Sequence, residues 1–172
     1  PALNKSRVFL AGALMNSSDD TQRMESLASA ARAGCSNDTV DCLKARAYAS
    51  NILSQLAASA GDDAKALTEM RRCAGEAERG FGAINQETAI AFMNLAIISR
   101  NTGHLSEASA AMQRAADASR GLRLRAADRA LMERTQAVID YDLGKFAAAR
   151  ERLRALIGNT SEAAERAVLL RI

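Results

Sequence analysis

The sequence predicts an all-α protein, and three observations support this expectation. Hydrophobic residues make up 48% of the 172 residues, yet aromatic residues make up only 3% and the chain has one proline. Much of the apolar content is alanine, which forms helices readily, as do leucine, arginine, glutamate and methionine. Apolar residues also recur with a helical period nearly throughout, and short polar or glycine-containing stretches interrupt them. We therefore expect a series of consecutive helices.

The interruptions place the helices in order along the chain. They fall at 16–20, 34–41, 60–63, 79–86, 101–104, 120–125, 143–145 and 158–161. Eight full helices and a partial ninth result, each of about 12 to 20 residues. Gly103 and Gly144 suit the left-handed position that follows a helix, where a Cβ atom would clash. Asn85 and Ser161 are predicted N-caps, because a side-chain oxygen there accepts hydrogen bonds from the first helical turn.

A self-comparison of the sequence reveals a repeating unit. The segment NLAIISRNTGHLSEASAAMQRA, residues 94–115, has counterparts upstream and downstream, and their glycines recur at steps of 42 and 41 residues, at Gly61, Gly103 and Gly144. In each copy, a helix with a large residue followed by a small one precedes the glycine. The next helix carries small, large and small residues, as at Ala108, Met112 and Ala115. Small residues allow close helix packing, and hairpins with one exposed apolar face stack on each other.

The repeat divides the whole chain into hairpins. We expect helix pairs over 5–33, 38–79, 85–120 and 125–157, of which the first is degenerate, and a terminal helix over 161–172. The start PALNKSRVFL and the end AVLLRI indicate a fragment of a larger protein, since the last apolar pattern ends without a cap. The apolar end AVLLRI is also a candidate surface for self-association.

Charge argues against nucleic-acid binding, and the lengths of the apolar runs argue against membrane insertion. The chain has 23 basic and 20 acidic residues, a net charge of +3. The densest basic stretch, residues 120–134, contains acidic residues too, and its arginines do not share one helical face. A nucleic-acid-binding protein usually has a denser basic stripe, so we expect this chain to bind no nucleic acid. No run of 18 apolar residues occurs, so we expect no membrane insertion by this segment.

The residues that often carry chemistry do not form a catalytic pattern. His104, the only histidine, follows Gly103 and is expected to be an exposed turn residue. Asp140 and Asp142 lie on opposite sides of a predicted helix, and the sequence has no phosphate-binding glycine loop. Cys73 falls on a packing position of the repeat, where a buried structural thiol is expected. We therefore expect no enzyme activity, no cofactor and no metal site.

Cys35 and Cys42 flank the loop sequence CSNDTVDC between two predicted helices. Helix ends on either side of a short loop can bring two Cα atoms within about 6 Å, as a disulfide requires. The alternative is a pair of unlinked thiols. The cytoplasm is the favoured compartment for unlinked thiols, whereas a disulfide indicates a periplasmic or other extracytoplasmic location.

The repeat resembles a known family. The pattern of large, small and glycine positions is clearest at Leu95, Ala96, Gly103, Ala108, Met112 and Ala115. This pattern is similar to that of the tetratricopeptide repeat (TPR), and its length is similar to that of the longer type found in kinesin light chains. The resemblance covers most of the chain. It departs at Gln136, where a leucine is usual, and at GAINQET, which replaces a proline-containing turn.

The resemblance implies a right-handed superhelical array of antiparallel helix hairpins, whose concave face binds a protein or peptide. The first helix of each pair lines that face. The implied groove residues are Tyr48, Asn51, Gln55, Met93, Asn94, Ile97, Arg100, Asn101, Arg134, Val138 and Tyr141. An asparagine at the position of Asn94 often hydrogen-bonds the backbone of a bound peptide in this family, and the alternative is that it braces neighbouring helices.

These expectations favour a non-catalytic scaffold module that binds a protein or peptide ligand. The alternative function is an extracytoplasmic sensory or regulatory region of a bacterial membrane-spanning signalling protein, such as a kinase or transcription regulator. The state of Cys35 and Cys42 distinguishes the two, because a disulfide forms in an oxidising compartment.

Overall fold

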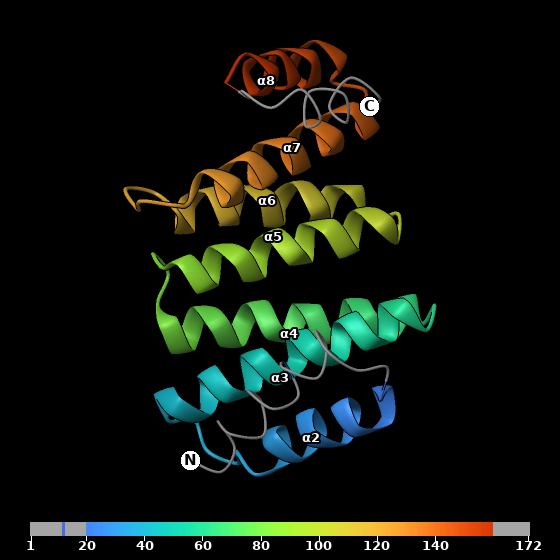
Figure 1. Cartoon of the computed structure of the whole chain (residues 1–172), viewed down its shortest axis with the longest axis vertical. Coiled ribbons are helices and arrows are strands. Elements are labelled where there is room, and N and C mark those ends of the chain that lie inside the picture. The colour runs from blue at the N-terminus through green and yellow to red at the C-terminus, as the bar shows by residue number, and fades with distance from the viewer. Residues whose placement is uncertain (1–11, 13–19, 160–172) are drawn as a thin grey trace.

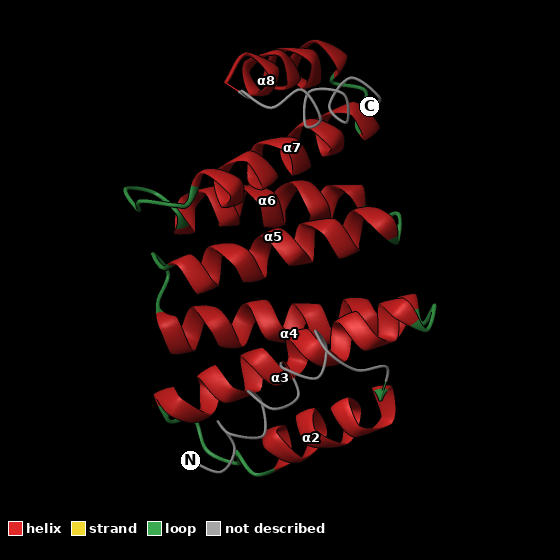
Figure 2. Ribbon diagram, in the orientation of Figure 1, coloured by secondary structure: helices red, strands yellow, loops and turns green. Residues whose placement is uncertain are grey.

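The computed structural model describes residues 20–159 together with residue 12, and this part of the chain is all α-helical (Figure 2). The described residues contain seven helices and no strand, which confirms the predicted all-α class. The helices are α2 (Thr21–Ala33), α3 (Val40–Ser59), α4 (Asp63–Phe81), α5 (Gln86–Asn101), α6 (Leu105–Ala118), α7 (Ala126–Asp142) and α8 (Phe146–Asn159). None of the described helices is long and apolar enough to cross a membrane. The predicted terminal helix over 161–172 and most of the first helix of the 5–33 pair lie outside the described residues.

The helices pack in chain order, so that each contacts the next (Figure 1). The two strongest antiparallel pairings are α3 with α4 and α5 with α6, and α7 packs on α8 as extensively as α4 packs on α5. The helix α5 also contacts α7, the next helix but one. The main core is formed by buried residues of the five helices from α3 to α7. A smaller apolar cluster joins α2 to α3.

Three of the helix pairs are joined by the same glycine turn. Gly61, Gly103 and Gly144 have φ angles of 77°, 80° and 75°, in the left-handed region that favours glycine. The residue after each glycine donates its N–H to the carbonyl five residues earlier, at distances of 2.9, 2.7 and 2.8 Å. These bonds satisfy carbonyls at the helix end, as a Schellman motif does. The equal geometry confirms that the predicted turns are equivalent.

The predicted cap at the start of α5 is also present. The Asn85 Oδ1 atom accepts a hydrogen bond from the backbone N–H of Glu87 at 2.8 Å, and Asn85 itself has extended backbone angles. Asp62 caps α4 in a similar way, through the N–H of Lys65 at 3.0 Å. Ser161 lies outside the described residues.

Equivalent positions of the first two clear repeats have equivalent burial. Leu53 and Leu95 are both buried, at the large position of the first helix. The small, large and small positions of the second helix are buried in both copies, namely Ala66, Met70 and Cys73 in α4 and Ala108, Met112 and Ala115 in α6. This agreement shows that the sequence repeat is a repeat of packing positions.

The α7–α8 pair keeps the register despite its departures. Ala137 is fully buried, one step of 41 residues after the fully buried Ala96, and Ala149 is buried after Ala108 by the same step. Gln136, which replaces the expected leucine, is half-buried and donates from Nε2 to Asp140 Oδ1 at 3.0 Å. A polar partner within the same helix therefore satisfies the amide that stands in a leucine position.

Ion pairs link helices that are two apart in the chain. Arg32 of α2 donates two hydrogen bonds to Glu69 of α4, at 2.8 and 2.6 Å. Arg71 of α4 forms a bidentate pair with Glu107 of α6, at 2.7 and 2.8 Å. A further pair joins Arg114 of α6 to α4. Neighbouring hairpins therefore contact each other through their second helices at the surface as well as through the core.

Candidate functional site

One stripe of α5 stays accessible although the helix is packed on several sides. The residues Thr88, Ala89, Phe92, Leu95 and Ser99 are buried, because α5 contacts α4, α6 and α7. The accessible stripe follows helical spacing of three and four residues and consists of Glu87, Ile90, Asn94, Ile97 and Asn101.

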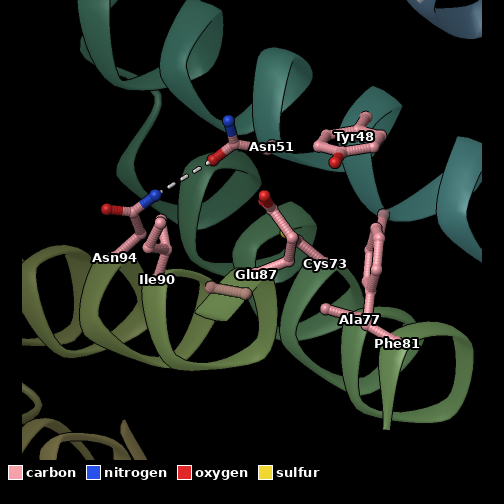
Figure 3. A pocket seen from close by; sticks show the side chains of 10 residues that line it. Tyr48, Asn51, Cys73, Ala77, Phe81, Glu87, Ile90 and Asn94 are labelled. Carbon is pink, nitrogen blue, oxygen red and sulfur yellow. Dashed lines mark hydrogen bonds between the residues drawn. The ribbon is translucent and has the colours of Figure 1, made fainter. Parts of the chain in front are cut away.

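A similar stripe runs along α3. Lys44, Tyr48, Asn51 and Gln55 are half-buried or exposed, whereas the residues between them are mostly buried. Tyr48 and Asn51 lie on the same side as Asn94 of α5 (Figure 3). The first helices of two successive hairpins therefore present side chains to one shared surface.

A small cavity lies where these two stripes meet α4. It has a volume of about 50 Å³ and lies between α3, α4 and α5. Its walls are Ala47, Tyr48, Asn51, Cys73, Ala77, Phe81, Glu87, Ile90, Ala91 and Asn94. Apolar side chains thus form most of the wall. Its hydrogen-bonding groups include the amides of Asn51 and Asn94, the carboxylate of Glu87 and the hydroxyl of Tyr48 (Figure 3).

The two asparagines form a bridge between α3 and α5. The Asn94 Nδ2 atom donates to Asn51 Oδ1 at 3.3 Å (Figure 3). An amide side chain has two N–H donors and one carbonyl acceptor. The Asn51 amide nitrogen and the Asn94 carbonyl oxygen are not part of this bond. The pair therefore presents both donor and acceptor groups at the cavity.

Aromatic rings and a carboxylate shape the other end of the cavity. Tyr48 packs edge-on against Phe81, with ring centroids 5.6 Å apart. Burial is the main reason why the pKa of Tyr48 is raised. The negative charge of Glu87 raises this pKa further, as does the hydrogen bond that the Tyr48 hydroxyl donates to the Glu87 carboxylate. The Lys44 ammonium lies 5.0 Å from the Phe81 ring centroid. The tyrosine is therefore a neutral hydrogen-bonding group at neutral pH.

The remaining predicted groove residues extend away from this cavity. Gln55 and Ile97 are half-buried further along α3 and α5, and Ile97 packs against the core. Arg100 bonds Asp142 of α7 through Nε at 2.5 Å, and Asn101 beside it is exposed. Arg100 therefore ties α5 to α7.

The predicted groove residues of α7 stay accessible. Arg134 and Tyr141 are exposed and Val138 is half-buried. Tyr141 packs edge-on against Phe146 at the start of α8, with ring centroids 5.3 Å apart. None of the three lines the cavity between α3, α4 and α5.

Met93 differs from the expectation that it lines the groove. Its side chain is only 5% exposed and belongs to the main core. The reason is helical geometry, because Met93 lies about 100° around the helix from Asn94, and that direction is covered by neighbouring helices. A partner on the accessible stripe would not reach it.

Residues that the sequence predicted to be structural are placed as expected. His104 is exposed before α6, with its Nδ1 atom 3.0 Å from Thr102 Oγ1. Cys73 is buried, and burial raises its pKa to about 12. Asp140 is buried and accepts from Arg152 Nε at 3.1 Å, whereas Asp142 is exposed and pairs with Arg100. The two aspartates therefore serve separate ion pairs.

The wall residues that sequence reasoning missed include three large side chains, those of Phe81, Glu87 and Ile90. Glu87 and Ile90 lie seven and four residues before Asn94, so helical spacing alone places them on the same stripe. Phe81 ends α4, and no repeat position marks it. The chain's only two tyrosines, Tyr48 and Tyr141, were both predicted to lie on this face.

Two larger hollows occur elsewhere on the described surface, of about 280 and 270 Å³. The first is lined by the pairs of Arg114 with Glu78 and of Arg120 with Asp117. The second is lined in part by Lys65 and Glu25, which also form an ion pair. The charged side chains of both walls already have partners within the chain, so the smaller cavity, with its paired asparagines, is the better candidate site.

No protein-family model matches the chain, and no curated protein matches it.

Proposed function

We propose that this chain is a non-catalytic binding module that holds an extended peptide segment of a partner protein. In this proposal the helix pairs form a TPR-like, right-handed superhelical array, and α3, α5 and α7 line its inner face. The proposal rests on one observation above all, which is the amide bridge between Asn51 and Asn94 beside an apolar cavity.

The amide bridge suits a peptide backbone. Each peptide unit has one N–H donor and one carbonyl acceptor, and both need partners when water is excluded. The Asn94 carbonyl oxygen is an acceptor for such an N–H, and the Asn51 amide nitrogen is a donor for such a carbonyl. Because the existing bond holds the two amides together at 3.3 Å, they are oriented before a ligand arrives.

The size of the cavity indicates what fills it. Pockets for metabolites or cofactors usually have volumes of about 300 to 1,000 Å³. At about 50 Å³, this cavity has room for the end of one side chain, and its aromatic and aliphatic walls favour an apolar one. One peptide side chain inserted between Tyr48 and Ile90 therefore fits better than a free small molecule.

The exposed aromatic residues support the same surface. The chain has no tryptophan and two tyrosines. Tyr48 is 37% exposed and Tyr141 is 51% exposed. Tyrosine is enriched in binding surfaces, because it offers a large apolar area and a hydrogen-bonding hydroxyl at a small entropic cost. A ligand running from α3 across α5 to α7 would contact both rings.

A selection experiment tests the proposal. Peptides are selected from a random phage-displayed library on the folded chain, and the affinity of a selected peptide is measured by fluorescence anisotropy. Asn94→Ala removes one backbone partner, which costs about 1 to 2 kcal/mol and weakens the affinity roughly 5- to 30-fold. Gln113→Ala is the matched control, because Gln113 is an exposed amide on α6 outside the cavity.

The control variant should bind as the wild type does. Equal affinity of the wild type and Asn94→Ala for every selected peptide would refute the proposed site. A loss of affinity shared equally by Asn94→Ala and Gln113→Ala would refute it as well, because the effect would then not depend on the cavity.

A further inference from the structure

Cys35 and Cys42 lie close together at the junction of α2 and α3. They are 3% and 5% exposed and form a small buried cluster with Ala45. The two side chains pack in this one cluster, and the Cys35 thiol lies near enough to Cys42 to influence its pKa. Two cysteine side chains that pack together across a short loop are arranged so that a disulfide can form between them.

The loop between the two cysteines is held independently of their thiols. Arg46 of α3 donates from Nη1 to the carbonyls of Cys35 and Asn37, each at 3.1 Å. Its Nη2 atom also bonds Asp38 Oδ1 at 2.7 Å, and Thr39 Oγ1 caps α3 by accepting from the Cys42 N–H at 3.4 Å. One half-buried arginine therefore fixes the loop in the shape that brings the thiols together.

The position of Cys42 favours its thiolate. Cys42 is the third residue of α3, where the partial positive charge of the helix N-terminus stabilises an anion. The hydrogen bond from the Cys35 thiol is the main reason why the pKa of Cys42 is lowered. Cys73 is the contrast within the same chain, because burial raises its pKa to about 12.

We propose that Cys35 and Cys42 form an oxidation site at which a hydroperoxide converts the two thiols into a disulfide between α2 and α3. The Cys42 thiolate attacks the outer oxygen of the peroxide, which breaks the O–O bond and expels an alkoxide, or hydroxide from hydrogen peroxide. This anion takes up the proton that the Cys42 thiol had lost and leaves as an alcohol or water. The resulting sulfenic acid is attacked by the Cys35 sulfur, and the S–S bond forms as hydroxide leaves and takes up the Cys35 proton as water. The two cysteines lose two electrons, which reduce the peroxide.

The disulfide would fasten α2 to the rest of the molecule. The contacts of α2 include a small apolar cluster, in which Ala28 and Ala31 meet residues of α3, and two ion pairs with α4, made by Arg32 and Glu25. The bond closes a loop of eight residues, counted from Cys35 to Cys42. Such a closure limits how far α2 can separate, and it is expected to raise the melting temperature by roughly 5 to 10 °C.

Peptide mapping tests the site with a control in the same digest. The reduced chain is treated with hydrogen peroxide, its remaining thiols are alkylated after unfolding, and tryptic peptides are weighed without reductant. Trypsin places both cysteines in one peptide, residues 33–44, and Cys73 in another, residues 73–79. We expect the first peptide to lose two hydrogen atoms and escape alkylation, while the Cys73 peptide is alkylated in full.

Variants separate the disulfide from general oxidation. Cys73→Ser should keep both the lighter peptide and the rise in melting temperature, whereas Cys42→Ser should lose both. The proposal would be overturned if the peptide of residues 33–44 were oxidised no faster than Cys73. It would also be overturned if the disulfides joined separate chains. A disulfide that forms without changing the melting temperature would overturn the fastening of α2.

Discussion

Replacing Leu95 with alanine perturbs the repeat at its large packing position. Leu95 is 7% exposed and belongs to the main core, where it stands one repeat after the buried Leu53. The substitution removes three carbon atoms, whose transfer from water contributes about 2 kcal/mol at about 0.8 kcal/mol per methylene. The cavity left behind adds a further cost, so we expect a loss of about 3 kcal/mol in the free energy of unfolding.

Urea denaturation and thermal melting measure this effect directly. For a chain of this length, a loss of about 3 kcal/mol lowers the melting temperature by roughly 6 to 12 °C. Leu131→Ala is the matched control, because Leu131 is 42% exposed on α7 and should lose less than about 0.5 kcal/mol. Equal stability of Leu95→Ala and Leu131→Ala would refute the assignment of Leu95 to the core position of the repeat.

Further predictions concern turns, ion pairs and pH. Gly103→Ala should lower the free energy of unfolding in urea by about 1 to 2 kcal/mol, because the φ angle of Gly103 is 80°, although no atom lies near a new Cβ. Gly75 is an exposed residue within α4 where a new Cβ also meets no atom, so Gly75→Ala should instead raise the free energy of unfolding by about 0.5 to 1 kcal/mol. Glu69→Ala should cost about 2 kcal/mol, because the buried carboxylate accepts charged hydrogen bonds from two arginines, and an unchanged urea midpoint would contradict this. The hydrogen bond from Arg71 lowers the pKa of Glu107, so its stabilisation is full above the ordinary value of 4.5 and is lost as pH falls through the lowered pKa. Melting curves of Glu107→Gln between pH 7 and pH 3 should therefore show a smaller acid loss than those of the wild type.

The local signals in the sequence predicted the helices and their turns well. Glycines that recur in step acquire positive φ angles, and an asparagine before an acidic first turn becomes an N-cap, because these effects depend on a few adjacent residues. Gly103 and Asn85 are therefore predictable from the sequence alone. The buried series at Ala108, Met112 and Ala115 follows from the same repeat.

The site was less predictable, because it depends on which sides of a helix are covered. Met93 and Asn94 are adjacent in the sequence, and only the packing of α4, α6 and α7 around α5 decides that the first is buried and the second accessible. Phe81 reaches the cavity because α4 ends beside Tyr48, a contact between different helices. Such contacts between helices have no local signature, whereas Glu87 and Ile90 were recoverable from helical spacing.

The shared surface of α3 and α5 is the central claim, and chemical-shift mapping tests it most directly. A selected peptide is titrated into the ¹⁵N-labelled chain, and backbone and asparagine side-chain signals are followed. The largest shifts are expected at Tyr48, Asn51, Glu87 and Asn94. Shifts concentrated instead on the outer surface of α4 and α6, at Arg71 and Arg114, would contradict the account.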